Sequence, residues 1–306
     1  MNRLRILHTA PGLWNASGGP ASRVPALCRA QAEMGGEVTL LSGSGEEDEL
    51  RSAAAGARVE QTRLGPYSLA RYSFEFRRKL VQEIARAQIV HTHGIWLFPN
   101  WQSVALATRS DTPTIVSPRG MLQPWALARS RVRKQAAWWA VAERMMKRAA
   151  LIHASSESEL EAIRDRRIGV PIAEVSNGVD VDHEFAWSRI SKLRSPNDRA
   201  FKRFVFLGRI HPVKGVDLLL DTWLRLGIPP QRARLLIAGP GEKAEIEKLE
   251  RWVQGRPGAG VEYLGPVQGG RKVELLASAW TVICPSWSES YGMVIAEALA
   301  SATPVI

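Results

Sequence analysis

The feature that most constrains the fold is an alternation of short apolar runs with longer stretches of helical spacing. Such alternation predicts βαβ units, with a parallel sheet covered by helices on both faces. In the first half, strands are predicted at Arg5 to Thr9, Glu37 to Ser42, Gln88 to His93, Thr112 to Ser117 and Ala150 to Ala154. Helices are predicted at Ala21 to Met34, Tyr72 to Ala87, Arg131 to Ala149 and Glu157 to Arg166, and a short one within residues 43–57.

A polar segment, residues 186–202, interrupts the alternation and is interpreted as a linker. It separates a first domain, 1–185, from a second, 203–306. In the second domain, strands are predicted at Arg203 to Leu207, Ala233 to Ala238, Val261 to Leu264, Thr281 to Cys284 and Pro304 to Ile306. Helices are predicted at Val216 to Arg225, at Lys243 to Gln254 and at Tyr291 to Ala300. A further short helix is predicted to end at Ala277. Parallel sheets bind ligands beyond the carboxyl ends of their strands, so a site is expected between two facing domains.

The amino-acid composition limits the classes of binding partner. Of 306 residues, 45% are hydrophobic and 23% charged, which is typical of a globular protein. There are 41 basic and 30 acidic side chains, a formal charge of 41 − 30 = +11. This excess favours an anionic partner: nucleic acid, a phosphorylated small molecule or an acidic membrane surface. Charge alone does not choose among them.

The two cysteines, Cys28 and Cys284, stand far apart in apolar surroundings and lack zinc-site spacing. They are predicted to be reduced thiols. The N-terminal residues have no signal-peptide core, and no apolar run approaches the length of a membrane span. These features predict a cytoplasmic protein.

The segment from Cys284 to Ala300 holds the strongest candidate site. Glu289 and Glu297 flank seven residues, the first in a loop after a strand and the second in a helix. The amides of Ser290, Tyr291 and Gly292 are expected at the helix N-terminus, where free N–H groups and the dipole favour an anion. The alternative is simple helix capping, with Glu297 on an exposed face.

A second candidate lies between Phe206 and Gly215. The predicted strand ends at Arg209, and Lys214 opens the next helix. Two cations at the carboxyl end of a strand can neutralise a diphosphate leaving group. The alternative is a pair of solvated basic side chains, which this chain has in plenty.

Four blocks in order give the chain a family resemblance: "NGVD", "FLGRIHPVKG", "LLIAGPGE" and "PSWSESYGMVIAEALASATPVI". The combination resembles the group 1 (family 4) glycosyltransferases. The resemblance implies the GT-B fold, an α/β architecture of two Rossmann-like doubly wound domains that face each other across a cleft. It also implies that the family pattern continues past Ile306, so the second domain is predicted to be incomplete.

The resemblance assigns roles in the second domain. Arg209 and Lys214 would bind the nucleotide diphosphate, Glu297 the ribose hydroxyls, and Glu289 the donor sugar. The remaining predicted donor contacts are Val267, near the base, and the amides of Ser290, Tyr291 and Gly292.

In the first domain, Gly18 and Gly19 resemble the family's glycine loop after the first strand. His93 matches the histidine that contacts the donor sugar near the reacting carbon. Its alternative is a strand-end histidine satisfied by its own loop. Arg119, at the end of a predicted strand, is a candidate on the acceptor side.

The function implied is that of a retaining glycosyltransferase of the hexosyltransferase type. It would transfer a sugar from a UDP-sugar or GDP-mannose to a hydroxyl of a glycan or lipid-linked acceptor, in cell-envelope polysaccharide biosynthesis. No cofactor is predicted. Asp180-Val181-Asp182 spells a DxD sequence but is interpreted as a turn, so no metal is predicted. A catalytically impaired nucleotide-sugar-binding fragment is the alternative.

One basic segment, Arg129 to Arg148, carries two tryptophans, Trp138 and Trp139. Such a helix can lie on an anionic membrane, so peripheral contact at the inner face of the cytoplasmic membrane is one prediction. The alternative is a helix that buries its tryptophans and solvates its charges. Nucleic-acid binding is a rival that the charge allows, but no recognition motif supports it.

Overall fold

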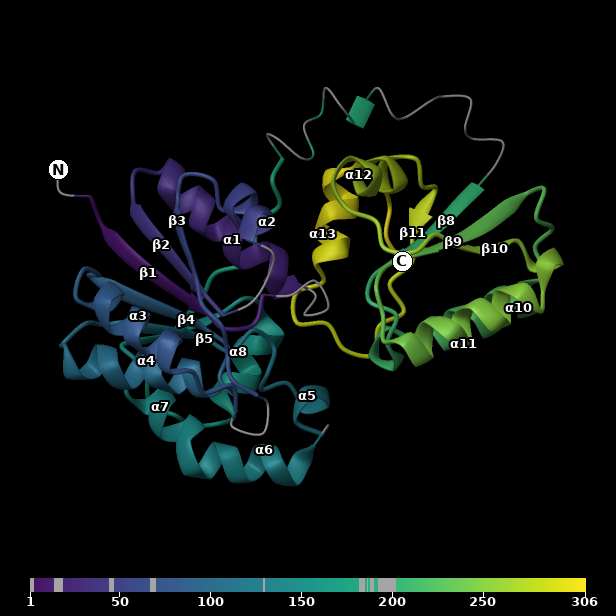
Figure 1. Ribbon diagram of the computed structural model, residues 1–306. Helices are drawn as coiled ribbons and strands as arrows, with labels where there is room; N and C mark the ends of the chain where they lie inside the picture. The colour runs from purple at the N-terminus through teal and green to yellow at the C-terminus, as the bar shows by residue number, and fades with distance from the viewer. Residues whose placement is uncertain are drawn as a thin grey trace. The chain divides into compact units, whose positions relative to one another are not determined.

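The structure is a computed structural model. It describes residues 3–13, 19–43, 47–66, 70–128, 130–181, 185, 187, 190–191 and 202–306. The chain divides into two compact units, Met1–Asn177 and Gly178–Ile306 (Figure 1). Of the predicted linker, only residues 187, 190, 191 and 202 fall within the described part of the chain.

The first unit is built on a seven-stranded sheet in the order β3-β2-β1-β4-β5-β6-β7. Every neighbouring pair is parallel. The strand order reverses between β1 and β4, which is where doubly wound sheets open a ligand crevice. The strands are β1 (Arg5–Ala10), β2 (Glu37–Ser42), β3 (Arg58–Gln61), β4 (Ile89–His93), β5 (Thr114–Ser117), β6 (Leu151–Ala154) and β7 (Ile172–Glu174).

Helices cover both faces of this sheet. Leu40 and Leu41 are neighbours on β2, and their side chains point to opposite faces. Leu40 packs in a buried cluster with Cys28 of α1, whereas Leu41 packs in another with Phe76 of α3. The helices are α1 (Gly19–Glu33), α2 (Glu47–Ala53), α3 (Phe74–Ile84), α4 (Phe98–Arg109), α5 (Pro124–Ala128), α6 (Arg131–Ala137), α7 (Glu143–Lys147) and α8 (Glu157–Arg164).

The long helix predicted over Arg131 to Ala149 is interrupted. Between α6 and α7, residues Trp138–Ala142 form a π-helical turn. Such a turn inserts one extra residue into a helix. Trp138 and Ala142 remain in the same buried cluster as Met145 and Met146 of α7.

The second unit has a four-stranded parallel sheet in the order β10-β9-β8-β11. The elements are β8 (Lys202–Leu207), β9 (Ala233–Ala238), β10 (Val261–Tyr263), β11 (Thr281–Val282), α10 (Val216–Leu226), α11 (Lys243–Gln254), α12 (Gly269–Ala277) and α13 (Met293–Ala300). Val305 forms a parallel bridge with Val282, so the final predicted strand pairs with β11. The two faces again have separate cores: Val205 packs with Leu276 of α12, and Phe206 with Leu220 of α10.

Both units therefore have the doubly wound α/β architecture that the alternation predicts. Within the part of the chain that the structure describes, no helix has the length and apolar character needed to cross a membrane.

Candidate functional site

In the second unit, Lys214 and Glu289 lie at the carboxyl ends of paired strands. Lys214 ends a 3₁₀ turn, Pro212–Lys214, after β8, and Glu289 lies in the loop after β11. Because β8 and β11 are parallel neighbours, their following loops share one edge of the sheet. Lys214 Nζ is 2.5 Å from Glu289 Oε1, and the Ser286 hydroxyl donates to the same oxygen over 2.8 Å.

A close backbone contact holds these two loops together. Gly215 has a φ of 68°, a left-handed conformation that favours glycine. A Cβ atom there would lie 2.1 Å from the carbonyl oxygen of Pro285. The Trp287 amide donates to the carbonyl of Val213 over 2.9 Å. Only a residue without a side chain allows this approach, which places Lys214 beside Glu289.

Glu297 has a cation partner that the sequence analysis did not find. Lys272 Nζ, on α12, lies 3.1 Å from Glu297 Oε1 on α13. The Glu297 side chain is 6% exposed and that of Lys272 is 15% exposed. The ammonium group also lies 5.5 Å from the centroid of the Phe185 ring. Glu297 is therefore a buried, charge-paired carboxylate and not an exposed-face residue.

The other predicted donor residues have mixed surroundings. Arg209 is half-buried, two residues past the end of β8. Val267 is buried in the cluster that joins α12 and α13. The predicted start of the last helix, Tyr291, is two residues too early: α13 begins at Met293 because Gly292, at φ 75°, is its N-cap. Ser290 and Tyr291 thus precede the cap.

Cys284 lies beside the Lys214–Glu289 pair. Its Sγ is 3.8 Å from both Ser286 Oγ and Glu289 Oε1. Burial raises the pKa of this thiol, and the charge of Glu289 raises it further. Burial raises the pKa of Cys28 to about 12. Both cysteines are free in the structure, Cys28 buried and Cys284 half-buried.

In the first unit, the strand ends hold a buried histidine cluster. The β1–β4 register places His8 opposite His91, and His93 follows two residues later on the same face. His8 Nδ1 lies 3.0 Å from His93 Nε2, and the two rings are stacked. Arg119, after β5, points its Nη2 at His93 Nδ1 over 3.2 Å.

The partners at the two ends fix the tautomers of His93 and His8. A guanidinium only donates, so His93 Nδ1 accepts from Arg119 and the proton of the neutral ring is on Nε2. His93 Nε2–H then donates to His8 Nδ1. This leaves the His8 proton on Nε2, which donates to Gln31 Oε1 over 2.7 Å. Hydrogen bonds therefore run in one direction from Arg119 through both rings to Gln31.

A second chain runs from His91. His153 Nε2 donates to the carbonyl of Val175 over 2.8 Å, so His153 Nδ1 accepts from the Ser117 hydroxyl over 2.8 Å. Ser117 Oγ then accepts from His91 Nε2 over 2.7 Å. Each ring in this chain is also neutral with its proton on Nε2.

Burial explains why these rings are neutral. It lowers the pKa of His8 to about 4, with a smaller lowering by the charge of Arg119. Burial likewise holds the pKa values of His91 and His93 well below their ordinary range, and the neighbouring histidines and Arg119 act in the same direction. The charge in this cluster belongs to Arg119.

Arg119 is half-buried, and its backbone is conformationally restricted. It has a φ of 55°, and its Nη1 donates to Asn177 Oδ1 over 2.9 Å. Burial lowers the pKa of its guanidinium, while the charge of Glu159 opposes that shift. Glu159 accepts from the Gly120 amide over 2.5 Å and from the Ser155 hydroxyl over 2.6 Å. This carboxylate fixes the turn that presents Arg119.

His8, His91 and His93 each offer a nitrogen, and these atoms lie within 4.8 Å of one another, close enough for a metal ion. A metal would have to break the His8–His93 hydrogen bond and tolerate the adjacent Arg119 cation. We therefore assign the cluster to hydrogen bonding. In the predicted DxD turn, Asp182 lies outside the described residues.

The structure thus brings together Lys214 with Glu289 and His93 with Arg119. Both ring nitrogens of His93 have protein partners in this arrangement. Gly19 is the first residue of α1, and Gly18 lies outside the described residues. Sequence reasoning missed His8, Gln31, His91, His153 and Lys272. The spacing of His91 and His93, two apart on one strand, was a signal that could have revealed the cluster.

Solved structures share this fold. HepE from Anabaena, in complex with UDP and glucose, matches with a TM-score of 0.75 at 20% identity, over 99% of this chain and 80% of that one. WaaG, a glycosyltransferase involved in lipopolysaccharide biosynthesis, matches with a TM-score of 0.66 at 14% identity, over 98% and 80% of the two chains. Two doubly wound α/β units in one chain are thus the GT-B architecture.

Two family models cover most of the chain. The glycosyl transferase 4-like domain matches residues 18–178, and glycosyl transferases group 1 matches residues 201–306. The chain therefore belongs to the group 1 glycosyltransferases.

Two curated relatives agree with this assignment. D-inositol 3-phosphate glycosyltransferase of a Nocardioides species is 30% identical over 75% of this chain, which spans about half, 54%, of that relative. Phosphatidyl-myo-inositol mannosyltransferase of Mycobacterium tuberculosis is 25% identical over 99% of this chain and 77% of that relative.

Proposed function

We propose that the protein is a retaining glycosyltransferase that transfers a sugar from a nucleotide-sugar donor to a hydroxyl of a glycan or lipid-linked acceptor. The observation that carries the proposal is the contact of Lys214 with Glu289 at the carboxyl ends of β8 and β11. Membership of the family and the UDP bound to HepE support a nucleoside diphosphate as the leaving group.

The proposed chemistry needs charge stabilisation more than a protein nucleophile. When the nucleoside diphosphate leaves the anomeric carbon, positive charge develops on the sugar and negative charge on the phosphate. Lys214 and Arg209 would stabilise the phosphate, and the N-terminus of α13 would add its dipole. The acceptor hydroxyl would attack from the face that the phosphate leaves, with that phosphate as the base. No cofactor is needed.

The exposure of the Lys214–Glu289 pair suits this role. The Lys214 side chain is 21% exposed and that of Glu289 is 26% exposed. Ion pairs in contact with water contribute about 0–1 kcal/mol, so a diphosphate can replace the carboxylate at little cost. Glu289 would then be released to accept hydrogen bonds from sugar hydroxyls. Glu297 would accept from the ribose hydroxyls while Lys272 keeps it charged.

The proposed function extends to the acceptor and the compartment. We propose a role in cell-envelope polysaccharide biosynthesis on the cytoplasmic side of the membrane. The name of one curated relative, phosphatidyl-myo-inositol mannosyltransferase, supports a lipid-linked acceptor. Arg119 is the proposed acceptor-side cation. His93 has hydrogen bonds to His8 and Arg119 and would have to break one of them to contact the donor sugar. The free energy of ligand binding would have to compensate for that loss.

The test is a thermal-shift screen of UDP, GDP, UDP-sugars and GDP-mannose, followed by transfer assays with the stabilising donor. Stabilisation by one nucleotide series, with the product retaining the anomeric configuration by NMR, is the expected result. A chain stabilised by no nucleoside diphosphate would refute donor binding. Stabilisation without hydrolysis or transfer would instead support an impaired nucleotide-sugar-binding protein.

A further inference from the structure

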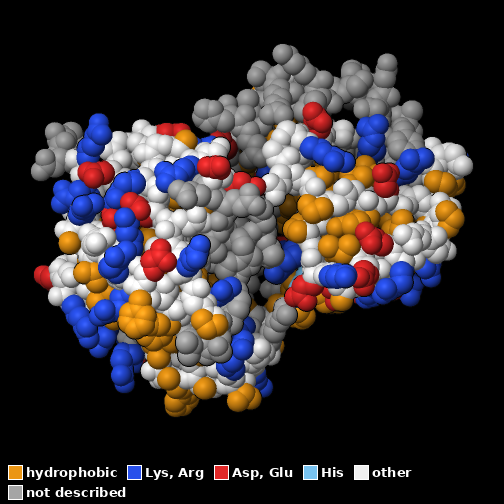
Figure 2. Space-filling view, in the orientation of Figure 1, with side chains coloured by type: hydrophobic (Ala, Val, Ile, Leu, Met, Phe, Trp, Pro, Cys, Tyr) orange, Lys and Arg blue, Asp and Glu red, His pale blue; other side chains and the backbone are white. Residues whose placement is uncertain are grey.

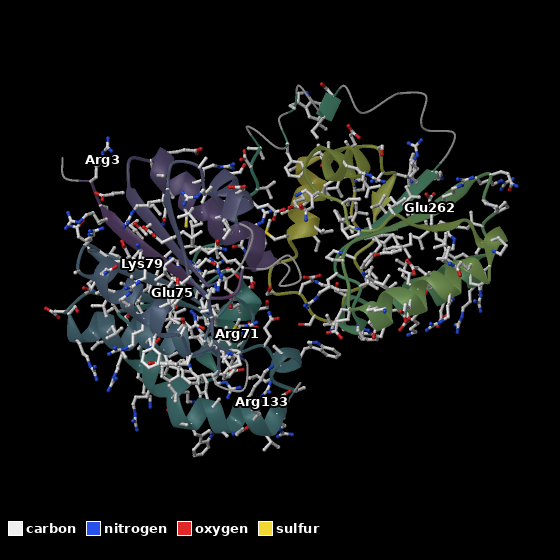
Figure 3. The ribbon with its side chains drawn as sticks, in the orientation of Figure 1. Arg3, Arg71, Glu75, Lys79, Arg133 and Glu262 are labelled. Carbon is white, nitrogen blue, oxygen red and sulfur yellow. The ribbon has the colours of Figure 1, made fainter. Side chains whose placement is uncertain are left out.

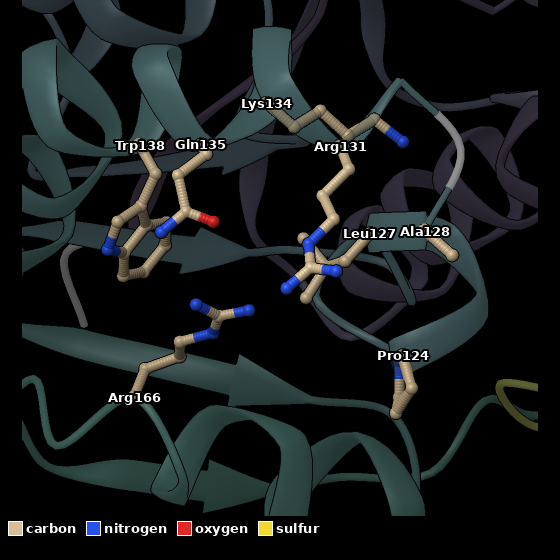
Figure 4. A pocket seen from close by; sticks show the side chains of 8 residues that line it. All are labelled: Pro124, Leu127, Ala128, Arg131, Lys134, Gln135, Trp138 and Arg166. Atoms are coloured by element: carbon tan, nitrogen blue, oxygen red, sulfur yellow. The ribbon is translucent and has the colours of Figure 1, made fainter.

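A pocket in the first unit lies outside the histidine cluster and the strand ends. It is formed by α5, by α6 with the first residue of the π turn, and by the segment after α8. Its apolar lining comes from Pro124, Leu127, Ala128 and Trp138, and its polar lining from Arg131, Lys134, Gln135 and Arg166 (Figure 4). Three of the eight lining residues are cations, and none is acidic.

The spacing of the helix explains how the pocket gathers its groups. Arg131, Lys134, Gln135 and Trp138 stand at i, i+3, i+4 and i+7, so they share one face of α6. Arg166 reaches the same face from the segment after α8 and lies over Trp138, with its guanidinium carbon 5.0 Å from the ring centroid. Stacking on a buried indole holds this guanidinium at the pocket wall.

No acidic residue lines the pocket to neutralise Arg131 and Arg166. Figure 4 shows the guanidinium groups of Arg131 and Arg166 pointing toward one another, with the Gln135 amide beside them. Among the residues that the structure describes, no carboxylate forms an ion pair with either arginine. Two converging guanidinium groups repel each other, and an anion between them would relieve the repulsion.

An exposed apolar stripe runs beside the pocket. Val132 and Trp139 are seven residues apart, one face over from the cations, and they are 84% and 71% exposed. Trp125 of α5 is 43% exposed. Figure 2 shows hydrophobic and basic side chains interleaved over this lower part of the unit. Tryptophan with arginine and lysine is the composition of proteins that lie at a lipid–water interface.

We propose that this pocket binds a phosphate monoester, held between Arg131 and Arg166 with Gln135 as a further donor. Planar guanidinium groups match phosphate oxygens in bidentate fashion, and a monoester presents three of them. The adjacent stripe of Val132 and Trp139 favours a headgroup at a lipid surface over a free phosphorylated metabolite. The site does not depend on the transfer reaction, since it shares no residue with the proposed donor or acceptor groups.

The test is co-sedimentation with phosphatidylcholine vesicles that contain either phosphatidic acid, a monoester, or phosphatidylglycerol, a diester, at equal surface charge. We expect the wild type to prefer phosphatidic acid by at least tenfold. The R131Q/R166Q variant should lose that preference. The matched control is R133Q/R144Q, which removes two exposed arginines that do not line the pocket (Arg133 is labelled in Figure 3). It should keep the preference even if its overall affinity falls.

A soluble arm separates the two sources of phosphate. Glycerol 3-phosphate is titrated into the wild type, R131Q/R166Q and W139A by calorimetry. If the ligand is a lipid headgroup, W139A weakens vesicle binding several-fold and leaves glycerol phosphate binding unchanged. If the ligand is a free monoester, glycerol phosphate binds the wild type tightly and W139A changes neither measurement. Equal vesicle binding by wild type and R131Q/R166Q, with no glycerol phosphate binding, would overturn the proposal.

Discussion

The strand ends of the two units differ in how each stabilises a positively charged side chain. In the first unit, the half-buried Arg119 cation donates to the neutral side chains of Asn177 and His93, and the hydrogen bonds continue in one direction from His93 to His8. In the second unit, Lys214 contacts the Glu289 carboxylate, and both of these side chains are partly exposed. A neutral chain of hydrogen bonds holds side chains in one arrangement, whereas a partly exposed ion pair can exchange one anion for another. The first arrangement favours positioning and the second favours ligand exchange.

Removing Lys214 should give the largest effect. We expect Lys214→Ala to weaken nucleoside diphosphate binding about 100-fold, since a charge-assisted hydrogen bond contributes about 1.5–3 kcal/mol. The free energy of unfolding should change by less than about 1 kcal/mol, because the lost ion pair is partly exposed. Calorimetry and urea unfolding measure the two quantities.

The control for this variant is Lys248→Ala. Lys248 also pairs with a carboxylate, Asp217 in the first turn of α10, but both of these side chains are more than half exposed. It should change neither quantity. If Lys214→Ala and Lys248→Ala had equal affinity for the nucleotide, the Lys214–Glu289 pair would be no different from an ordinary surface ion pair, and its proposed exchange with a diphosphate would be contradicted.

Lowering the pH should reduce the free energy of unfolding of the first unit. The folded pKa of His8 is about 4, below its ordinary value of 6.5. The unfolded chain therefore binds more protons between these values, so stability present above pH 6.5 is lost as the pH falls toward 4. At about 1.4 kcal/mol per pH unit, His8 alone should cost about 2 kcal/mol between pH 7 and pH 5.

Urea unfolding at pH 7 and pH 5 measures this loss, and His8→Gln should reduce the difference. Gln can still accept from His93 and donate to Gln31, but it does not titrate. NMR titration of the histidine ring protons gives an independent reading, since His8 should remain neutral at pH 5. A His8 ring that titrates near 6.5 would contradict the assignment.

Ser117→Ala should give the smallest of the three effects. Its hydroxyl bridges His91 and His153 and is buried, so the variant leaves a donor and an acceptor without their partner. A cost of about 1.5 kcal/mol is expected in the free energy of unfolding, with nucleotide affinity unchanged. Ser117→Thr keeps the hydroxyl and should recover part of the loss. A large change in nucleotide affinity would show that the histidine chain does more than position side chains.

The sequence predicted the fold class because buried parallel strands are short apolar runs. The edge strands β3 and β7 were missed, since Arg58–Gln61 and Ile172–Glu174 have little apolar character and are defined by backbone pairing. Helix α4 was also missed, because the residues around Phe98 form an aromatic run without clear helical spacing.

The sequence predicted several residues of the candidate site but not which of their side chains contact one another. The resemblance pointed to Lys214, Glu289 and Glu297, but the Lys214–Glu289 contact joins residues 75 apart and depends on how closely Gly215 approaches Pro285. Nothing in the local pattern of α12 marks Lys272 as the partner of Glu297. Its role follows only from the packing of two helices.

The π turn at Trp138–Ala142 has a mechanical consequence for the pocket. One residue of an α-helix corresponds to about 100° of rotation about its axis. The wider π turn absorbs this rotation, because it spreads one extra residue over an arc that an α-helix covers with one residue fewer. Deleting one residue from the turn would therefore regularise the helix and leave Arg131 and Lys134 facing Arg166. Inserting one more residue, with α7 fixed in its core, would instead rotate α6 by about 100° and carry Arg131 and Val132 away from their present positions.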